Sequence, residues 1–420
     1  MKQGLQGELA HHVAAYRPGW SLPRAFYREQ ALYRTDIEQI WRRGWLFAGH
    51  DCELRNPGDW LTLQVDTDSI IVIRGEDGAA RALHNVCRHR GSQLVAPGRG
   101  SSKRIVCPYH QWTYDTGGAL TFCRGMHEID KSQFSLKKVH CETVEGLIFI
   151  SLADPAPPFG PARELMAPFL RPQGFARAKV AKQVDYEIAA NWKLVWENNR
   201  ECFHCNINHP QYIKANWDHY NADDTSADVR AAMDRVLEKN KIKWADAGLL
   251  VSHRETGMTQ FPDAERGIWY SANRTALVEG WVSESMDGRQ VSTLMGDYRD
   301  ADVGTVRART LPNFWNHSSC DHGVSTRLLP LGSQQTAIRV WWLVDEKAVE
   351  GRDYDLAKLM PFWQLTSEQD WLICERQQTG INSSAYRPGL YSAFKEYNVD
   401  SFVRWYLNVV RGASCVGANK

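Results

Sequence analysis

The sequence has almost no net charge and no long apolar segment. Its 50 basic and 49 acidic residues give a formal net charge of +1, so no overall field attracts nucleic acid or an anionic membrane surface. No apolar run approaches the length of a membrane span, and the N-terminal residues lack an apolar core followed by a small-residue cleavage site. We therefore expect a cytoplasmic protein that acts on small molecules, with neither nucleic acid nor membrane as a partner.

Cysteine is sparse, and a nucleotide-binding glycine motif is missing. Ten Cys among 420 residues are too few for a disulfide framework, which fits a reducing compartment. The glycines form no G-x-G-x-x-G between a strand and a helix, so nothing indicates a bound dinucleotide. A hydrophobic content of 43% and 17 Trp instead predict a folded chain with enough core for two domains.

Two short arms each combine one Cys with one His: Cys87-Arg88-His89 and Cys107-Pro108-Tyr109-His110. Two thiolates and two imidazoles fit a [2Fe-2S] cluster that has sulfur ligands on one iron and nitrogen ligands on the other. A structural zinc site with two Cys and two His is the alternative. Zinc fingers usually present Cys-x-x-Cys and His-x(3-5)-His, so the ligand order favours the cluster.

The hydrophobic and turn patterns divide the chain into three parts. Residues 1–43 predict a helical segment that packs on the larger domain. Residues 44–154 predict an all-β domain around the two arms. The proline-rich stretch 154–161 marks a boundary, because proline lacks an amide donor and fixes its own φ. Residues 162–420 mix helical and strand patterns, which predicts an α+β domain with an antiparallel sheet.

Local signals add several predicted elements. Thr35-x-x-Glu38 has the form of a helix-starting capping box. Residues 70–83 predict a hairpin that leads into the first arm, and residues 146–151 and 337–344 predict strands. Asp400 and Gly412 are placed to begin and end a C-terminal helix.

A second group of metal-binding side chains lies in the larger domain. Residues 191–204 predict a helix that brings Glu197, Glu201 and His204 near one face. Pro210 should end or distort the helix near His209, so that the two imidazoles approach each other. With a later carboxylate they would form a facial triad that leaves open positions on Fe(II).

The third ligand must come from elsewhere in the chain. Asp370, in the apolar segment 367–375, is the best candidate, although Glu368 and Glu375 would serve nearly as well from spacing alone. Cys202 and Cys205 flank His204, and we expect them to be free, small apolar residues and not ligands.

With both groups in view, the chain resembles the terminal oxygenase (α) subunits of the Rieske non-heme iron oxygenases. The resemblance rests on residues 87–91, 107–112, 191–210 and 370–378. It implies a Rieske β-sandwich joined to a helix-grip (START-like) catalytic domain. It also implies a [2Fe-2S] cluster and a mononuclear Fe(II). The implied cluster ligands are Cys87, His89, Cys107 and His110, and the implied iron ligands are His204, His209 and Asp370.

The resemblance also gives Glu201 a role. It implies a C3 homotrimer in which Glu201 links His204 to His110 of the partner subunit and so connects the two metal centres. Many aromatic-ring dioxygenases have Asp at this position. The longer Glu, within the run 197–205, is more similar to the subgroup that demethylates quaternary ammonium compounds such as glycine betaine and proline betaine (stachydrine).

The implied activity is O2-dependent hydroxylation of an N-methyl group, followed by release of formaldehyde. Electrons would come from NAD(P)H through a separate flavin and [2Fe-2S] reductase. Trp244, Trp269, Tyr270 and Trp281 are candidates for cation–π contact with the ammonium group. Two alternatives remain open at this point: an aromatic-ring hydroxylating oxygenase, and a Rieske electron-transfer protein whose large domain only binds a partner.

Overall fold

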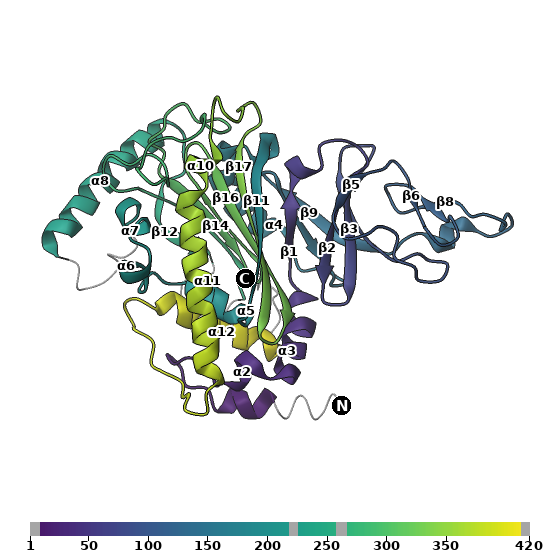
Figure 1. Cartoon of the computed structure of the whole chain (residues 1–420), viewed down its shortest axis with the longest axis horizontal. Helices are drawn as coiled ribbons and strands as arrows, with labels where there is room; N and C mark the ends of the chain where they lie inside the picture. The colour runs from purple at the N-terminus through teal and green to yellow at the C-terminus, as the bar shows by residue number, and fades with distance from the viewer. Residues whose placement is uncertain (1–8, 218–225, 258–266, 413–420) are drawn as a thin grey trace.

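The computed structural model describes residues 9–217, 226–257 and 267–412. Two bodies rich in antiparallel strands lie side by side, and helices cover the larger one (Figure 1). No helix in these three described ranges is both long and apolar enough to cross a lipid bilayer.

The smaller body contains two sheets. Its seven-stranded sheet has the order β1-β10-β9-β4-β3-β2-β5, and β6-β7-β8 form a three-stranded sheet. The strands are Leu46–His50 (β1), Asp59–Val65 (β2), Asp68–Arg74 (β3), Ala80–His84 (β4), Arg99–Ser101 (β5), Ile105–Val106 (β6), Thr113–Tyr114 (β7), Leu120–Phe122 (β8), Lys138–Val144 (β9) and Leu147–Ser151 (β10). The predicted hairpin is confirmed as β3–β4, and the predicted strand at 146–151 is β10.

Strand β3 is buried on both faces. Ile70 and Val72 belong to the large core shared with the larger body, whereas Ile71 and Ile73 belong to a separate core beside the Cys-His arms. Because successive side chains of a strand point to opposite faces, this run of four apolar residues separates the two cores.

The larger body is a seven-stranded antiparallel sheet in the order β11-β17-β16-β15-β14-β13-β12. Its strands are Ala178–Ile188 (β11), Ser252–Gly257 (β12), Tyr270–Thr275 (β13), Thr305–Thr310 (β14), Phe314–Ser318 (β15), Gly323–Gly332 (β16) and Gln335–Asp345 (β17). The predicted strand at 337–344 is the centre of β17.

Most helices in the described ranges are short. Besides a helical stretch at 9–14, they include Ala25–Arg28 (α2), Gln30–Asp36 (α3), Gly160–Leu170 (α4), Trp192–Asn199 (α5), Cys205–Asn208 (α6), Tyr212–Ala215 (α7), Ala227–Asp246 (α8), Leu356–Leu359 (α10), Pro361–Asn382 (α11) and Tyr397–Val410 (α12). A π-helical turn covers Ile37–Trp41, and 3-10 turns cover Asp51–Glu53, Lys131–Phe134, Arg171–Gln173 and Phe175–Arg177.

Helix α11 runs along one face of the larger sheet (Figure 1). The ring of Trp371 on this helix lies 6.5 Å from the ring of Trp315 in β15 and 6.3 Å from the ring of Tyr186 in β11. The side chain of Gln378 accepts a hydrogen bond from the backbone N–H of Asn191, the N-cap of α5, at 3.0 Å. Helices α5 and α11 are therefore fixed to each other as well as to the sheet.

A buried carboxylate at the end of α3 attaches this helix to the larger body. Asp36 accepts hydrogen bonds from Trp192 Nε1 at 2.9 Å, from Lys193 Nζ at 2.5 Å and from the hydroxyl of Tyr406 at 2.7 Å. A buried carboxylate needs such partners, since an unpaired charge away from water is costly. This network joins α3 to α5 and α12.

Two predicted helix starts were wrong. Thr35 does not start a helix, because α3 continues through it and its hydroxyl donates to the carbonyl of Ala31 at 3.1 Å. Helix α12 begins at Tyr397, so Asp400 lies in its first turn. Helix α4 begins at Gly160, within the proline-rich stretch, because Pro161 occupies a first-turn position that needs no N–H donor.

Candidate metal centres

The two Cys-His arms form equivalent loops at the end of the smaller body. In the first, the N–H of Gly91 donates to the carbonyl of Cys87 at 3.0 Å, and the N–H of Cys87 donates to the carbonyl of Ser92 at 2.8 Å. In the second loop, the N–H of Gln111 donates to the carbonyl of Cys107 at 3.0 Å, and the N–H of Cys107 donates to the carbonyl of Trp112 at 2.8 Å. Gly91 and Gln111 both have positive φ, which each tight loop requires.

These loops bring the four predicted cluster ligands together. The rings of His89 and His110 lie 4.7 Å apart, and His89 stacks on Trp112 at 4.9 Å. The thiols of Cys87 and Cys107 are within hydrogen-bonding reach of each other and are buried. The four residues that the sequence suggested as ligands therefore lie together in the structure.

The donor atoms fit a metal cluster. Nδ1 of His89 and Nδ1 of His110 are inaccessible to solvent and have no hydrogen-bond partner among the described residues. A buried nitrogen without a partner costs about 1–3 kcal/mol, unless it binds a metal. Burial raises the pKa of the Cys107 thiol, but hydrogen bonds from the backbone N–H of Tyr109 and from Cys87 bring it below its usual value, which favours a thiolate.

The hydroxyl of Tyr114 reaches the same cluster site, and the sequence analysis did not identify it. It lies 3.4 Å from Cys87 Sγ and accepts a hydrogen bond from the backbone N–H of Arg88 at 3.1 Å. Polar groups that contact a cluster sulfur tune its reduction potential. Only its position two residues after Trp112, in the strand that follows the second arm, could have suggested this contact.

The second site begins where helix α5 ends. The predicted helix over 191–204 is shorter than expected, because α5 ends at Asn199 and Glu201 lies in the loop that follows. Glu197 faces away from that loop and accepts a hydrogen bond from the hydroxyl of Tyr27 at 2.8 Å. Burial raises the pKa of Glu197 to about 8, against the lowering effect of Tyr27 and Lys193. Glu197 therefore belongs to the packing of the N-terminal helices.

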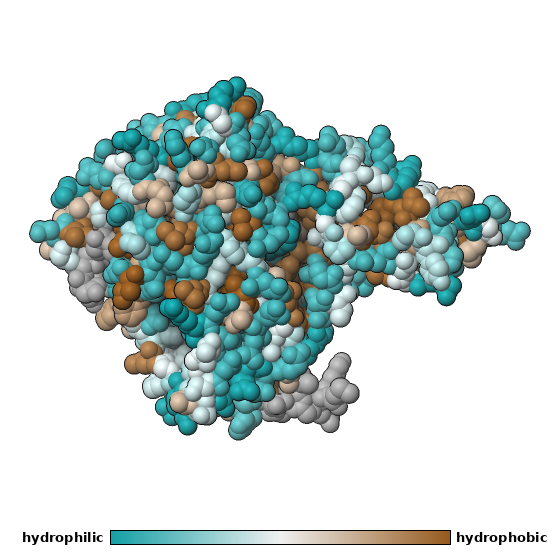
Figure 2. Space-filling model, viewed as in Figure 1, coloured by the Kyte–Doolittle hydropathy of each residue, from teal (hydrophilic) through white to brown (hydrophobic). Residues whose placement is uncertain are grey.

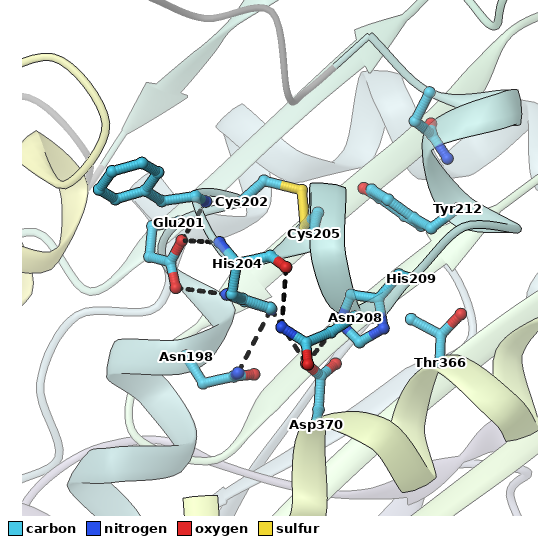
Figure 3. The surroundings of a disulfide bond; sticks show 12 residues. Asn198, Glu201, Cys202, His204, Cys205, Asn208, His209, Tyr212, Thr366 and Asp370 are labelled. Atoms are coloured by element: carbon cyan, nitrogen blue, oxygen red, sulfur yellow. Dashed lines mark hydrogen bonds and ion pairs between the residues drawn. A yellow bond between two sulfur atoms is a disulfide. The ribbon is translucent and has the colours of Figure 1, made fainter. Parts of the chain in front are cut away.

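Two imidazoles and one carboxylate converge beyond this loop (Figure 3). His204 is the N-cap of α6 and His209 its C-cap, so the helix that ends near His209 is this separate short helix and not a continuation of α5. Nε2 of His204 lies 3.1 Å, and Nε2 of His209 2.9 Å, from Oδ1 of Asp370 on α11. Three donor atoms that meet at one point have the arrangement a facial triad requires.

The structure also distinguishes Asp370 from its acidic neighbours. Glu368 accepts hydrogen bonds from Gln364 at 2.9 Å and from the hydroxyl of Tyr186 at 3.3 Å. Glu375 accepts a hydrogen bond from the backbone N–H of Ala189 at 2.9 Å. Of these three carboxylates, only Asp370 is paired with His204 and His209.

The other nitrogen of each imidazole is held by a separate partner. Nδ1 of His204 lies 2.5 Å from Oε1 of Glu201, and Nδ1 of His209 lies 2.8 Å from Oε1 of Gln369. A hydrogen bond at Nδ1 leaves Nε2 as the metal-binding atom and fixes the ring. Gln369 was missed from the sequence, although its position beside Asp370 offered a signal.

Cys202 and Cys205 form a disulfide on either side of His204 (Figure 3). This corrects the expectation that both are free cysteines. The sulfur of Cys205 is near the imidazoles, since its ligand atom and those of His204 and His209 lie within 4.8 Å of one another. A disulfide sulfur carries no thiolate charge, so the oxidised pair does not compete with Asp370 for a metal.

A cavity of about 610 Å³ opens beside the triad. Its lining includes His204, His209 and Asp370 together with aromatic side chains, which are Tyr212, Trp217, Trp315, Trp363, Trp371 and Tyr397. This volume suits a small organic molecule.

The four aromatic candidates from the sequence lie elsewhere. Trp244 donates from Nε1 to the carbonyl of Asp302 at 2.9 Å, Trp269 packs between Phe159 and Tyr270, and Trp281 packs against Gly288. Trp244, Trp269, Tyr270 and Trp281 do not line the cavity beside the triad, which corrects that choice. The aromatic residues that do line the cavity come from β15, α7 and the loop after it, α11 and the start of α12.

Two protein-family models match separate parts of the chain. Residues 44–133 match the Rieske [2Fe-2S] domain, and residues 175–412 match the ring hydroxylating alpha subunit (catalytic domain). The second match contains His204, His209 and Asp370.

Among curated proteins, the chain is 40% identical to the glycine betaine monooxygenase oxygenase subunit of Pseudomonas aeruginosa strain UCBPP-PA14, over 92% of this chain and 88% of the relative. The glycine betaine monooxygenase oxygenase subunit of Chromohalobacter salexigens is also 40% identical, over 92% of this chain and 85% of the relative. A solved quaternary ammonium Rieske monooxygenase, described for carnitine oxidation and inter-subunit electron transfer, has a TM-score of 0.70 at 20% identity and covers 94% of this chain and 97% of its own.

Proposed function

Because the chain belongs to the Rieske non-heme iron oxygenases, as an oxygenase α subunit, we propose that it is the terminal oxygenase of a system that demethylates a quaternary ammonium compound of the glycine betaine or proline betaine type. The product amine and formaldehyde would form from a hydroxylated N-methyl group. The observation that carries this proposal is the convergence of His204, His209 and Asp370 beside an aromatic-lined cavity in a chain 40% identical to glycine betaine monooxygenase oxygenase subunits.

The proposed ligands follow from the geometry. Cys87, His89, Cys107 and His110 would hold the [2Fe-2S] cluster, and His204, His209 and Asp370 would hold the iron. The iron, when bound, would supply oxygen activation at its open coordination positions. Glu201 and Gln369 orient the two imidazoles, and the buried side chains of the cavity exclude water from the reacting methyl group.

The ammonium group would bind through desolvation and contact with aromatic faces. A quaternary ammonium has no N–H to donate, so it cannot be bound through hydrogen bonds from its nitrogen. Each contact of the cation with an aromatic face contributes about 1–2 kcal/mol to binding when water is excluded. Trp315, Trp363 and Trp371 line the cavity that holds Asp370 and are suited to this role. They take the place of the four aromatic residues suggested by the sequence.

We also propose a C3 homotrimer in which Glu201 accepts a hydrogen bond from His110 of the partner subunit. In support, exposed apolar side chains surround the cluster loops, among them Val86, Tyr109 and Phe122, and Figure 2 shows a hydrophobic area on the smaller body. Apolar patches of this kind mark interaction surfaces. The relative described for inter-subunit electron transfer shares the fold.

The remaining parts of the proposal concern organisation. We propose that residues 1–43, 44–154 and 162–420 are the N-terminal helical segment, the Rieske domain and the catalytic domain, and that the protein is cytoplasmic. A separate flavin and [2Fe-2S] reductase would deliver electrons from NAD(P)H, which is consistent with relatives that are named as oxygenase subunits.

The proposal is tested with purified protein coupled to a Rieske-oxygenase reductase and supplied with O2. We expect formaldehyde from glycine betaine or proline betaine, in proportion to the substrate consumed. A dihydrodiol from an aromatic substrate, with no formaldehyde from any methylated amine, would contradict it. Metal analysis distinguishes the electron-carrier alternative: the oxygenase needs about three irons per chain, and a carrier needs about two.

A further inference from the structure

The sheet that forms one wall of the cavity presents two buried arginines. Arg307 and Arg309 both lie in β14 and both line the cavity, with only 5% and 7% of their surfaces exposed. Residues two apart in a strand point to the same face. Two guanidinium groups therefore project from one strand toward the space beside the triad.

Their neighbours across the sheet belong to the same wall. In the antiparallel register, Arg309 lies opposite Trp315 and Arg307 lies opposite His317, both in β15. Side chains directly opposite each other in such a pair have Cβ atoms about 5 Å apart. Trp315 and His317 also line the cavity, so this wall places aromatic and cationic groups next to each other.

The state of His317 supports this concentration of positive charge. Burial first, and then the charges of Arg307 and Arg309, hold the pKa of His317 well below its usual range. Its imidazole is therefore neutral and packs against Trp363, with ring centres 4.2 Å apart. The positive charge on this wall is carried by the two guanidinium groups.

Buried polar groups hold the guanidinium of Arg307 in place. Its Nη2 donates to the hydroxyl of Tyr212 at 3.1 Å and to Oδ1 of Asn216 at 2.9 Å. Asn216 in turn donates to the buried Glu284 at 3.2 Å. This network orients the guanidinium from α7 and from the loop that follows it.

Helix α11 forms the opposite wall. Trp363, Asp370 and Trp371 recur at helical spacing on the side of the helix that faces the sheet, and all three line the cavity. The ring of Trp371 lies 6.5 Å from that of Trp315. An aromatic surface thus extends from the proposed iron ligand Asp370 to the arginine-bearing strand.

We propose that Arg307 and Arg309 bind the carboxylate of a zwitterionic substrate while the aromatic side chains hold its quaternary ammonium group beside the iron site. This inference rests on the proposed function and assigns the residues that bind the carboxylate of such a substrate. A guanidinium binds a carboxylate through paired N–H donors in one plane. A quaternary cation without a carboxylate would offer these paired N–H donors no anionic acceptor of its own.

The test compares glycine betaine with its carboxamide analogue, in which a neutral amide of nearly the same size replaces the carboxylate. Affinities for the metal-loaded protein are measured by isothermal titration calorimetry. We expect glycine betaine to bind at least about tenfold more tightly than the carboxamide, because charge-assisted hydrogen bonds are lost. Equal affinity for the two ligands would overturn the inference.

Variants then assign the effect to the arginines. Arg309→Met should weaken the binding of glycine betaine by about tenfold or more while leaving the carboxamide unchanged or tighter, and Arg309→Lys should fall between wild type and Arg309→Met, because it keeps the charge and loses the planar pair of donors. Arg352→Met, at an exposed arginine that pairs with Asp353 on the surface, is the matched control and should leave both affinities unchanged. An equal loss for both ligands in Arg309→Met would contradict a role in carboxylate binding.

Two further readouts keep the outcomes separate. The visible absorption of the cluster reports a folded, loaded protein, and Arg309→Lys keeps the inference testable if Arg309→Met does not fold. Formaldehyde from the carboxamide as fast as from glycine betaine would overturn this inference and leave the proposed function standing. Absence of formaldehyde from every quaternary ammonium compound would instead contradict the proposed function.

Discussion

Glu201 contacts His204 at both its backbone and its ring. Oε2 accepts a hydrogen bond from the backbone N–H of His204 at 3.3 Å, and Oε1 lies 2.5 Å from Nδ1 of the ring. A single carboxylate thus holds the loop that follows α5 and the orientation of a proposed iron ligand. The same side chain is mostly buried, with 13% of its surface exposed.

The variant Glu201→Gln tests whether this carboxylate connects the two metal centres. An amide keeps the size of the side chain but loses the charge, so we expect both metals to remain bound and electron transfer between them to slow by about 10–100-fold. Stopped-flow absorption of the prereduced cluster, mixed with substrate and O2, measures its reoxidation. Reoxidation at the wild-type rate would show that Glu201 does not act between the centres.

Replacing Asp370 tests the proposed third iron ligand. Asp370→Asn should reduce the iron content from about three to about two per chain, because the mononuclear site loses its only anionic ligand while the [2Fe-2S] cluster persists. Glu368→Gln, two residues away on the same helix and hydrogen-bonded to Gln364, is the control and should keep all the iron. If only Glu368→Gln lost iron, Glu368 and not Asp370 would be the third iron ligand.

The cluster ligands are tested by Cys87→Ser. Serine replaces the thiolate with a poor ligand for iron, so the visible absorption and the electron paramagnetic resonance signal of the reduced cluster should disappear. Cys123→Ser is a matched control, because Cys123 is also buried in the smaller body but its thiol donates to the carbonyl of Met126. An intact signal in Cys87→Ser would remove this residue from the ligand set.

Iron binding to the metal-free site should release a proton. Burial favours the neutral imidazole, but hydrogen bonds with Asp370 and Glu201 raise the pKa of His204 to about 10. Because a ligating imidazole must be neutral, Fe(II) displaces this proton at neutral pH, and its affinity should increase as pH rises toward 10. Anaerobic calorimetry in buffers of different ionisation enthalpy counts the proton. Identical enthalpies in all the buffers would contradict a protonated His204.

The cluster arms were predictable from the sequence because their geometry is local. Each ligand pair lies within four consecutive residues, and a tight loop brings its Cys and His to one side. The choice of Asp370 over Glu368 and Glu375 needed the fold, because only the direction of α11 across the sheet decides which carboxylate meets His209. The resemblance to a family indicated the carboxylate that lies beside both imidazoles, where spacing could not.

The cavity residues could not be found in the same way. In β14 and β15, every residue is buried, so hydrophobicity does not reveal which alternate set faces the cavity and which faces the other side of the sheet. Trp244 and Trp269 are aromatic residues in the central segment of the catalytic domain, but they belong to packing outside the cavity. The disulfide was missed because the pairing of Cys202 with Cys205 depends on the loop conformation beyond α5.

Strand β3 links the packing of the two bodies. Its four apolar side chains alternate between the core beside the cluster loops and the core shared with the catalytic body. A shift of one residue along the strand would exchange the two sets, placing each side chain in the wrong environment. Strand β3 therefore serves both cores at once, so a register error in it would disturb the packing beside the cluster loops together with the packing against the catalytic body.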